Sequence, residues 1–575
     1  MTRIIPSNAI AVIIQMWPLI VGLVNRLLVE QIRDKYRAHW LMQLEQSLDL
    51  SRIEQGCAGF HQGSGRGSWT RHAVPQLVRA LLVKYLFDLS YRETELKIDL
   101  DMLVKGWVGY SLFESPPDHT TLQRFEVWVL EHQPRLFFDD ILRQIEAVFP
   151  DEREQLQLVD TYAMLVRGAK TSLITLIRQT SARLLAELER ADPTRYEQLL
   201  AQLDLAALFG AEDEKLTAAL NAQERVERLQ QVAGAALRLH RLLSGLLRIP
   251  PFFKAEQEEV LAGWLHHLDK IISDETQVSY ADPAQPDGVT IKERKHGHKG
   301  QYRIACVNDI MATYRDHGKG KPAELAHNAA VMATERFVWE VEVITGAAPD
   351  PTPLTLMLQN IARYHGFWPA KVVGDQIFGA GKHRAAVDQA SGGQTQLIAL
   401  VPDYDKRTDR FVPADFSPVE GGFGVICPGD LLSTKVSPKP EADGLSYYFT
   451  AKQCRGCPFW ISLEQLQQHP DLPHCRLPDG KPNARRTVFI SDYRHYTLDA
   501  LEYNQTAQFK QEIKRRPIIE RIIFNLTHYH GARRCKSTGL EKATFQLRLA
   551  ATAFNIRQLL RLRPKIPDTA AALGG

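Results

Sequence analysis

The stretch "KRRPIIERIIFNLTHYHGARRCKS" (residues 514–537) predicts an amphipathic helix on which a single acid stands among bases. Pro517 suits the first helical position, and the apolar residues that follow fall on one stripe: Ile518, Ile519, Ile522, Ile523 and Leu526. Glu520 projects from the flank of that stripe, together with Thr527. From Gln505 to Lys565 the chain has fourteen Lys and Arg against three acids. We therefore expect the Glu520 carboxylate to face a site.

Upstream of this helix, the chain alternates between strand and helix patterns. Strands are predicted at 156–166, 300–310, 336–346, 370–375 and 395–401, and helices at 353–366 and 381–390. With the longer insertions removed, the order is three strands, then helix, strand, helix, strand and helix. This order predicts an α/β fold, with a mixed sheet flanked by helices.

Two further acids lie at informative places in this layout. Asp160 interrupts the apolar first strand, where Asp is disfavoured. Asp375 ends the fourth strand, before the turn "QIFGAGK", and the carboxyl ends of strands are where open α/β sheets bind ligands. Each acid also has a simple structural interpretation: Asp160 as a strand-end residue, Asp375 as a cap, and Glu520 as a partner of the helix dipole. Together, three oxygen donors suit Mg²⁺ or Mn²⁺.

The remaining patterns are helical, apart from a segment rich in proline and cysteine. They divide the chain into N-terminal helices with a Gly/Ser-rich linker (1–69), a second helical block (70–150), the α/β core (151–170 and 278–402), a helical insertion (171–277), a cysteine-bearing insertion (403–500) and C-terminal helices (501–575). The leucine stripe of the helical insertion predicts a core or a partner-helix face. The 171–277 run shows no fixed repeat period.

Composition excludes several classes of protein. A chain of 575 residues with 44% hydrophobic and 24% charged residues is typical of a soluble protein with two or three domains. The apolar stretch 9–24 contains Gln15 and Pro18 and is short for a membrane span, so we expect a buried helix and no membrane partner. Seven cysteines in so long a chain predict a reducing compartment rather than a disulfide framework.

Four of the cysteines fall in one segment and suggest a metal site. Cys454 and Cys457 form a CxxC pair, and Cys427 and Cys475 flank it. Four thiolates suit a structural, tetrahedral Zn²⁺, although reduced buried cysteines are the alternative. His474 is a second candidate for the fourth ligand. Trp460, beside the CxxC pair, is either a core residue or a surface on which a base stacks.

Four stretches carry a resemblance to a known family. They are "LVDTYAMLVRGAK" (158–170), "VVGDQIFGAGKHRAAV" (372–387), the segment from 515 to 562 that begins "RRPIIERIIFNLTHYHG", and "PQLVRALLVKYLFDLSYRETELKIDLD" (75–101) with "PDHTTLQRF" (117–125). These stretches resemble the RNase H-like DDE transposases of bacterial insertion sequences and their N-terminal helical domain. The resemblance covers about residues 70–166 and 280–565, and its C-terminal part is the most specific.

The resemblance implies a set of site residues. It assigns the catalytic, metal-binding acids to Asp160, Asp375 and Glu520 and an accessory arginine to Arg516, with an RNase H-like core and two Mg²⁺ or Mn²⁺ ions. The family's lysine seven residues after the Glu is Thr527 here, which puts a DNA contact in doubt. The basic residues around Glu520 are candidate phosphate contacts: Arg515, Arg516, Arg521, Arg533, Arg534 and Lys536. The histidines of "HYH" (528–530) suit phosphate or surface contacts better than a metal.

The implied function is a DNA transposase of the bacterial cytoplasm, associated with the nucleoid. Its partners would be double-stranded DNA, the terminal inverted repeats of its element, target DNA and a second copy of itself. Two alternatives stay open at this point. One is a catalytically inactive DNA-binding protein descended from a transposase, and the other is a zinc-stabilised structural protein without DNA chemistry.

Overall fold

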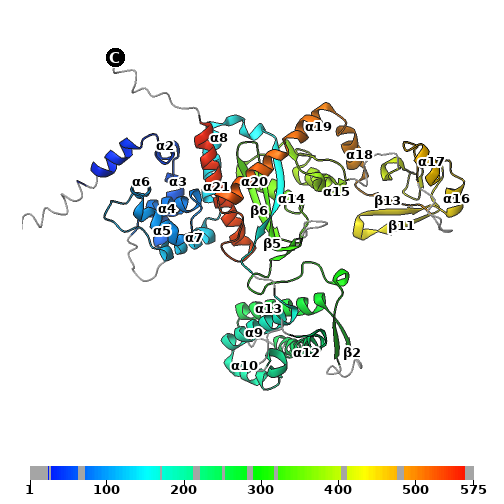
Figure 1. The fold of residues 1–575 in the computed structure, drawn as a ribbon, viewed down its shortest axis with the longest axis horizontal. Coiled ribbons are helices and arrows are strands. Elements are labelled where there is room, and N and C mark those ends of the chain that lie inside the picture. Colours follow the sequence, from blue (N-terminus) through cyan, green and yellow to red (C-terminus); the bar gives the residue numbers. More distant parts are fainter. Residues whose placement is uncertain are drawn as a thin grey trace, which may run out of the picture.

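The computed structural model describes residues 24, 27–62, 72–168, 171–210, 220–248, 253–280, 289–315, 322–402, 411–475 and 485–563. Apart from Val24, the apolar stretch 9–24 lies outside the described residues. Among the helices in these ranges, none combines the length and apolarity that crossing a membrane requires. The N-terminal helices, a helical insertion and a cysteine-bearing segment lie around a central sheet (Figure 1).

The central sheet is mixed, as predicted. β1 (Gln157–Leu165) pairs antiparallel with β5 (Glu324–Ala333) and parallel with β7 (Lys371–Val373). β7 continues in parallel to β8 (Gln396–Ile398), while β6 (Val338–Thr345) and the short β4 (Thr313–Arg315) pair antiparallel with β5. β1 therefore lies inside the sheet, with the antiparallel strands on one side and the parallel strands on the other.

The prediction of a strand at 300–310 is wrong. Residues 301–310 contain no helix or strand, and the first long strand of the sheet after β1 is β5, at 324–333. Its sequence, "ELAHNAAVMA", contains four Ala and one Asn, which have weak strand propensity, yet eight of its ten residues are buried. Packing on both faces of the sheet, rather than strand propensity, therefore stabilises β5. Ile304 and Val307 pack instead into the core of the helical insertion.

Two predicted helices lie on the sheet where the sequence placed them. They are α14 (Leu354–His365) and α15 (Gly381–Ser391). The chain ends with α18 (Arg494–Tyr503), α19 (Ala507–Glu512), α20 (Pro517–Tyr529) and α21 (Leu540–Leu562). α20 packs on β1 and β5, and α21 packs on β6.

The N-terminal helices share one hydrophobic core with the sheet. They are α2 (Trp40–Ser47), α3 (Ser51–Gly56), α4 (Val74–Leu86), α5 (Tyr91–Leu100), α6 (Met102–Val108), α7 (His119–His132) and α8 (Leu136–Val148). α4 and α8 pack against α21. The fully buried Glu340 of β6 binds Arg135, at the start of α8, with an Nη2 to Oε2 distance of 2.9 Å, and Arg548 of α21 approaches its other oxygen at 3.9 Å. The helical block and the sheet are therefore joined by buried charge as well as by apolar packing.

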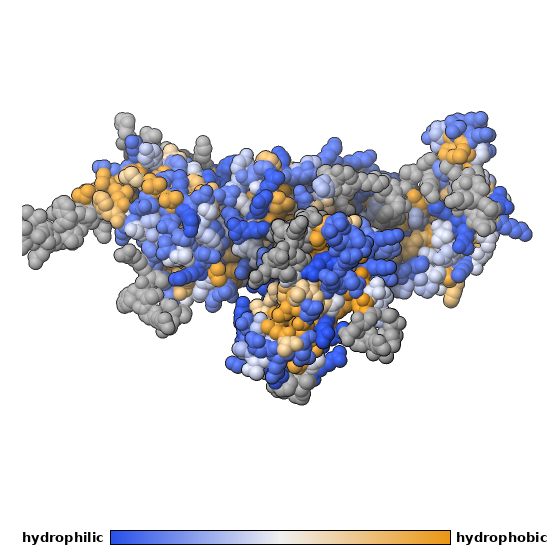
Figure 2. Space-filling view, turned by 60° about the horizontal axis from the view of Figure 1, so that its bottom comes forward, coloured by the Kyte–Doolittle hydropathy of each residue, from blue (hydrophilic) through white to orange (hydrophobic). Residues whose placement is uncertain are grey.

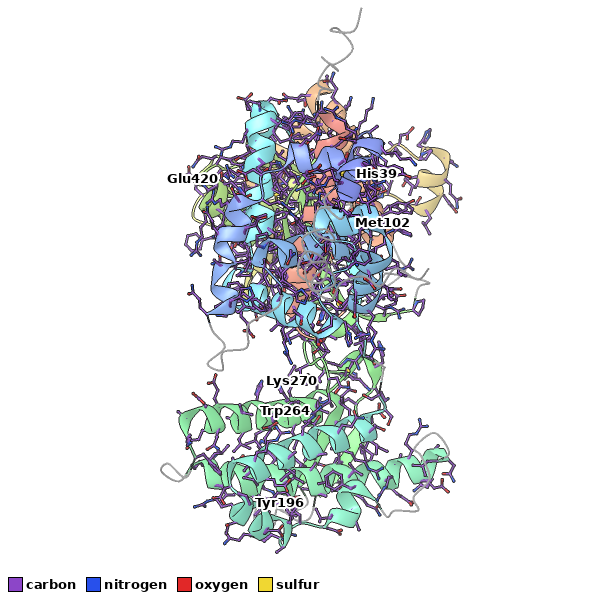
Figure 3. All side chains as sticks on the ribbon, turned by 90° about the vertical axis from the view of Figure 1, so that its left-hand side faces the viewer. His39, Met102, Tyr196, Trp264, Lys270 and Glu420 are labelled. Atoms are coloured by element: carbon purple, nitrogen blue, oxygen red, sulfur yellow. The ribbon has the colours of Figure 1, made fainter. Side chains whose placement is uncertain are left out.

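The helical insertion between β1 and β4 forms a body with its own core (Figures 1 and 3). It contains α9 (Leu173–Ala191), α10 (Pro193–Leu200), α11 (Leu205–Phe209), α12 (Ala222–Leu247) and α13 (Ala255–Glu275). A hairpin of β2 (Thr276–Tyr280) and β3 (Val289–Glu293) joins this core, because Gln230 of α12 hydrogen-bonds both Val289 and Ile291. The boundary predicted between 277 and 278 falls inside this hairpin. Figure 2 shows apolar side chains exposed on this body among hydrophilic ones.

The cysteine-bearing segment lies at the opposite end of the molecule from the N-terminal helices (Figure 1). A three-stranded antiparallel sheet supports it, formed by β11 (Lys435–Lys439), β12 (Gly444–Tyr448) and β13 (Thr487–Ser491). The pair β9 (Ser417–Pro418) and β10 (Val425–Ile426) and the short helices α16 (Ala451–Arg455) and α17 (Leu463–Gln468) complete it. Phe416, Tyr447 and Phe449 form its small core.

Candidate active site

Asp160 lies in the middle of β1, opposite Val331 of β5. Its side chain is only 15% exposed. Oδ1 accepts a hydrogen bond from the backbone N–H of Thr161 at 2.8 Å, and Oδ2 accepts one from Nη2 of Arg516 at 3.2 Å. The sheet thus carries a carboxylate in its interior, and the only cation bonded to it comes, in the part of the chain that the structure describes, from a residue 356 positions away.

Asp375 follows β7, separated from it by Gly374. It caps the short 3-10 helix Gln376–Gly379, and its Oδ1 accepts a hydrogen bond from the N–H of Ile377 at 3.0 Å. A Cβ on Gly374 would lie 2.9 Å from Cβ of Phe378, so the chain needs a glycine to make this turn. The capping interpretation and a ligand role are compatible, because the capping bond uses one oxygen of the carboxylate.

Glu520 lies in the first turn of α20, and its side chain is 55% exposed. Arg516 precedes it by one turn and forms an ion pair with it, with Nη1 2.8 Å from Oε1 of Glu520. The same guanidinium also binds Asp160 through Nη2. One arginine therefore bridges two of the three predicted acids, a geometry for which the planar fork of Arg is suited.

The electrostatics show that these acids act on one another. Burial raises the pKa of Asp160 to about 6; the Thr161 N–H and Arg516 oppose this rise, and the charges of Asp375 and Glu520 add to it. Burial also raises the pKa of Asp375, again with Arg516 in opposition. The fold therefore brings Asp160, Asp375, Glu520 and Arg516 to one place.

A fourth carboxylate, Asp350, was missed by the sequence reasoning. Burial, the Ile377 N–H and Arg516 affect the pKa of Asp375 more strongly, but the negative charge of Asp350 also raises that pKa. Oδ1 of Asp350 accepts hydrogen bonds from Arg315 at 3.0 Å and from Asn328 at 2.8 Å. The available signal was an acid in the proline-rich turn just after a predicted strand, "GAAPDPTP" (346–353).

Apart from Arg516, the predicted phosphate contacts divide into two sets. Arg515 forms an ion pair with Glu335 at 3.3 Å, and Lys536 forms one with Asp88 of the helical block at 3.2 Å. Exposed side chains form the other set: Arg521, Arg533 and Arg534. Residues 533–535 run beside the end of β1, because the N–H of Leu165 donates to the Arg533 carbonyl and the N–H of Cys535 donates to the Leu165 carbonyl. Thr527 turns its hydroxyl back to the Ile523 carbonyl at 2.9 Å.

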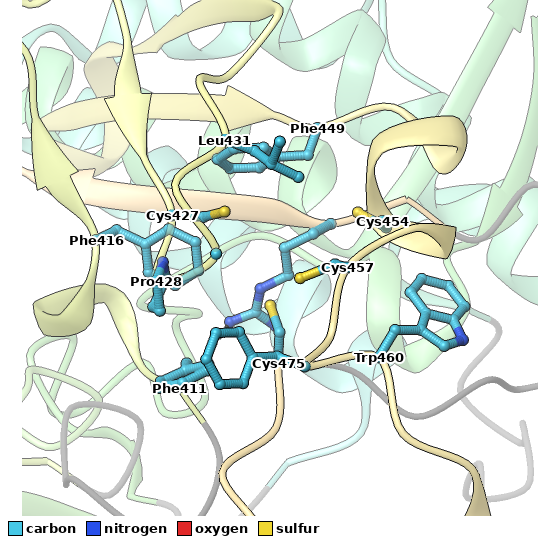
Figure 4. A pocket seen from close by; sticks show the side chains of 13 residues that line it. Phe411, Phe416, Cys427, Pro428, Leu431, Phe449, Cys454, Cys457, Trp460 and Cys475 are labelled. Atoms are coloured by element: carbon cyan, nitrogen blue, oxygen red, sulfur yellow. Dashed lines mark hydrogen bonds between the residues drawn. The ribbon is translucent and has the colours of Figure 1, made fainter.

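The four clustered cysteines line one cavity of about 20 Å³ (Figure 4). A cavity of this size has room for about one water-sized occupant. A Cβ on Gly429 would lie 2.8 Å from Sγ of Cys457 and 3.7 Å from Sγ of Cys427, so both sulfurs face this glycine. Burial raises the pKa of Cys475 to about 11. Arg486 and Trp460 also line the cavity, and His474 does not.

Neither set is arranged as a metal site as the side chains stand. Among the described residues, no group of three or more His, Cys, Asp or Glu side chains has a geometry that could hold a metal ion. At the acids, Arg516 supplies the positive charge instead. The donor chemistry still fits, because hard carboxylate oxygens suit Mg²⁺ or Mn²⁺ and thiolates suit Zn²⁺.

Comparison with protein families gives two matches. A Transposase DDE domain family matches residues 426–560, and the Transposase domain (DUF772) matches residues 29–127. Both matches support a DDE-type insertion-sequence transposase. No curated protein and no solved structure matched it. As a transposase it is expected to have an RNase H-like fold, to use divalent metal ions and to act on DNA.

The two matches cover different parts of the site. The DDE match includes Arg516 and Glu520 as well as all four clustered cysteines, so most of the cysteine-bearing segment falls within the matched family region. Asp160 and Asp375 lie before its first residue. The second match covers α2 to α6 and part of α7 in the helical block.

Proposed function

We propose that this transposase binds the ends of its mobile element and cuts and joins DNA strands, with Asp160, Asp375 and Glu520 as its catalytic acids. One observation carries the proposal: Arg516 pairs with both Asp160 and Glu520, 2.8 to 3.2 Å from each. A buried acid in a strand and an exposed acid in a distant helix have no structural need to share one guanidinium. A common ligand or substrate explains that arrangement.

Each residue has a distinct part in this proposal. Asp160, Asp375 and Glu520 would hold two Mg²⁺ or Mn²⁺ ions, which supply an activated water or 3′-hydroxyl and stabilise the charge on the attacking and leaving oxygens. The sheet fixes Asp160, and the Ile377 N–H orients Asp375. The side chain of Glu520 is the most exposed of the three and is free to adjust. Arg516 neutralises the acids and is near enough to contact a phosphate.

The exposed arginines extend the site towards DNA. We assign Arg521, Arg533 and Arg534 to phosphate contacts, because neutralising phosphates releases counterions and so drives binding. Arg515 and Lys536 would first have to leave Glu335 and Asp88. The DNA partners in this proposal are the terminal inverted repeats and a target duplex, bound by a homodimer at the bacterial nucleoid.

We also infer that Cys427, Cys454, Cys457 and Cys475 hold a structural Zn²⁺. Their shared cavity and the approach of Cys427 and Cys457 to Gly429 support this set over one that contains His474. Loops separate the two outer cysteines from the CxxC pair, so a bound ion would order the segment. Its role would be structural.

The experiment that tests the proposed function uses the full chain, Mg²⁺ and a duplex that carries the element's own flanking sequence. Cleavage at the element end, absent in Asp160→Asn, is the expected result. Salt-dependent binding without cleavage at any Mg²⁺ or Mn²⁺ concentration would instead identify an inactive relative. Absence of both binding and cleavage would overturn the proposal.

A further inference from the structure

An exposed pair of aromatic rings lies on α20 beyond Glu520. The rings of Phe524 and His528 stack, with centroids 3.9 Å apart and an interplanar angle of 20°. Phe524 is 50% exposed, and Tyr529, whose ring stands edge-on to Phe524 at 6.2 Å, is 59% exposed. Large aromatic side chains are usually buried more completely than this.

The stacked rings lie on the side of α20 that faces away from the sheet. Ile519, Ile522 and Leu526 bury the side of α20 that faces the sheet. Glu520, Phe524 and His528 follow one another at four-residue spacing, which places them along one ridge on the other side. The rise of a helix puts Phe524 about 6 Å and His528 about 12 Å along the axis from Glu520. Nδ1 of His528 lies 2.9 Å from the Phe524 carbonyl oxygen, which helps to fix the ring.

The surroundings indicate a nucleic acid rather than an apolar partner. Arg516 and Glu520 occupy the start of the same ridge, and the exposed Arg521 lies beside it. A phosphodiester that reached the acids would carry its nearest nucleotides about one to two helical turns away, at the distance of the rings. Every base has a π-face that can stack on an aromatic side chain.

We propose that the Phe524–His528 stack binds an unpaired nucleobase next to the phosphodiester at the acids. This inference rests on the proposed function and adds to it a substrate-contact residue. It requires that the duplex be opened locally, since a base inside a duplex is stacked on both faces by its neighbours. The base belongs either to the element end or to the target DNA.

The test places the fluorescent base 2-aminopurine at single positions near the cleavage site of an element-end duplex or, in a second arm, of a target duplex. Full-length protein is added with Ca²⁺ in place of Mg²⁺, so that binding is read without cleavage. Wild type should change the fluorescence at one or two positions in one arm, which identifies the source of the base. Phe524→Leu should abolish that change and weaken binding about tenfold, the effect of losing one stacked base.

Two variants make the result specific. Phe524→Trp keeps an aromatic face and should restore both signals, whereas Phe423→Leu, a control at a side chain that is 85% exposed in another part of the chain, should change neither. An unchanged fluorescence response in Phe524→Leu would overturn the inference. A change of oligomeric state in Phe524→Leu with unaltered DNA response would overturn it too, by assigning the rings to a protein interface. Wild type that neither binds DNA nor, with Mg²⁺, cuts it would refute the proposed function itself.

Discussion

The acids and the cysteines are both candidate metal sites, yet they are assembled in opposite ways. Asp160 and Arg516 are 356 positions apart, and only the completed sheet and α20 bring them together. The four cysteines lie within residues 427–475 and need only a small local core. A site built from distant segments reports on the fold of the whole core, whereas a local one can form or fail by itself.

An arginine accompanies each set, with a different task. Arg516 lies between ionisable carboxylates and pairs with two of them. Arg486 lines the cysteine cavity and donates to the Phe411 carbonyl at 3.1 Å. Carboxylates that share a site need a counter-charge even without metal, and protonated thiols do not. Substitutions at the acids and at the cysteines should therefore affect different properties of the protein.

The largest expected effect is at the acids. Asp160→Asn, Asp375→Asn and Glu520→Gln should each lower the cleavage rate by about 1,000-fold or more, because metal ions stabilise the reaction's charge by several kcal/mol. Binding to the element end, measured by fluorescence anisotropy, should change little.

The matched control for Glu520 is Glu541→Gln. Glu541 is an exposed acid in the first turn of α21, so it has the same relation to a helix dipole. If both variants cut DNA as well as wild type does, Glu520 only stabilises α20 through the helix dipole and has no role in cleavage.

The next effect is the salt dependence of end binding. Each phosphate contact adds about 0.9 to the slope of log affinity against log salt, so five contacts weaken binding about 500-fold between 50 and 200 mM salt. Replacing Arg521, Arg533 and Arg534 together with Gln should reduce the slope by about 2.7. Replacing the ion-paired Arg515 and Lys536 should reduce it less. A reduction of about 1.8, the full value for two contacts, would show that the ion pairs open on DNA.

The cysteines should respond to a different treatment. Metal analysis should find one zinc per chain, lost in Cys454→Ser and retained in Cys306→Ser, a buried cysteine that packs against Gly168 instead. A zinc-selective chelator should loosen the segment around residues 427–475, measured by hydrogen exchange, and lower cleavage by less than about tenfold. Wild-type protein without zinc would leave the four residues as reduced structural cysteines.

The smallest effect concerns recognition by the helical block. Gln123 and Arg124 are exposed on α7, and replacing both with Ala should reduce the preference for the element's own end about tenfold, the contribution of one good base contact. Competition with unrelated duplex DNA measures this preference. Unchanged preference would move recognition to another body. Deleting residues 70–148 would be a poor test, because that block shares its core with the sheet.

Patterns that depend on local chemistry were predictable from the sequence. The apolar stripe beside Glu520, the strand around Asp160 and the turn at Asp375 were all visible, and the resemblance linked them. β5 was not, because "ELAHNAAVMA" becomes a strand only through burial between β1 and β6. The segment 300–310 carries a better strand pattern, and packing against the helical insertion overrides it.

Contacts between distant segments were the other gap. Nothing local marks Asp350 as a neighbour of Asp375, or Lys536 as the partner of Asp88. The bridge from Arg516 to Asp160 likewise depends on how α20 lies against β1. Such pairs are properties of the tertiary structure, and a single sequence contains no pattern that reports them.

The packing of α4 and α8 on α21 also determines when this core can be completed during translation. The N-terminal helices leave the ribosome first, whereas the helix that completes their core is among the last segments to be translated. At about 5 to 20 residues per second, roughly 20 to 80 s separate the end of α8 from the start of α21. During that interval the surfaces of α4 and α8 that pack against α21 in the complete protein lack this partner. A ribosome that stops before residue 540 therefore releases a fragment for chaperones or proteases rather than a DNA-binding module.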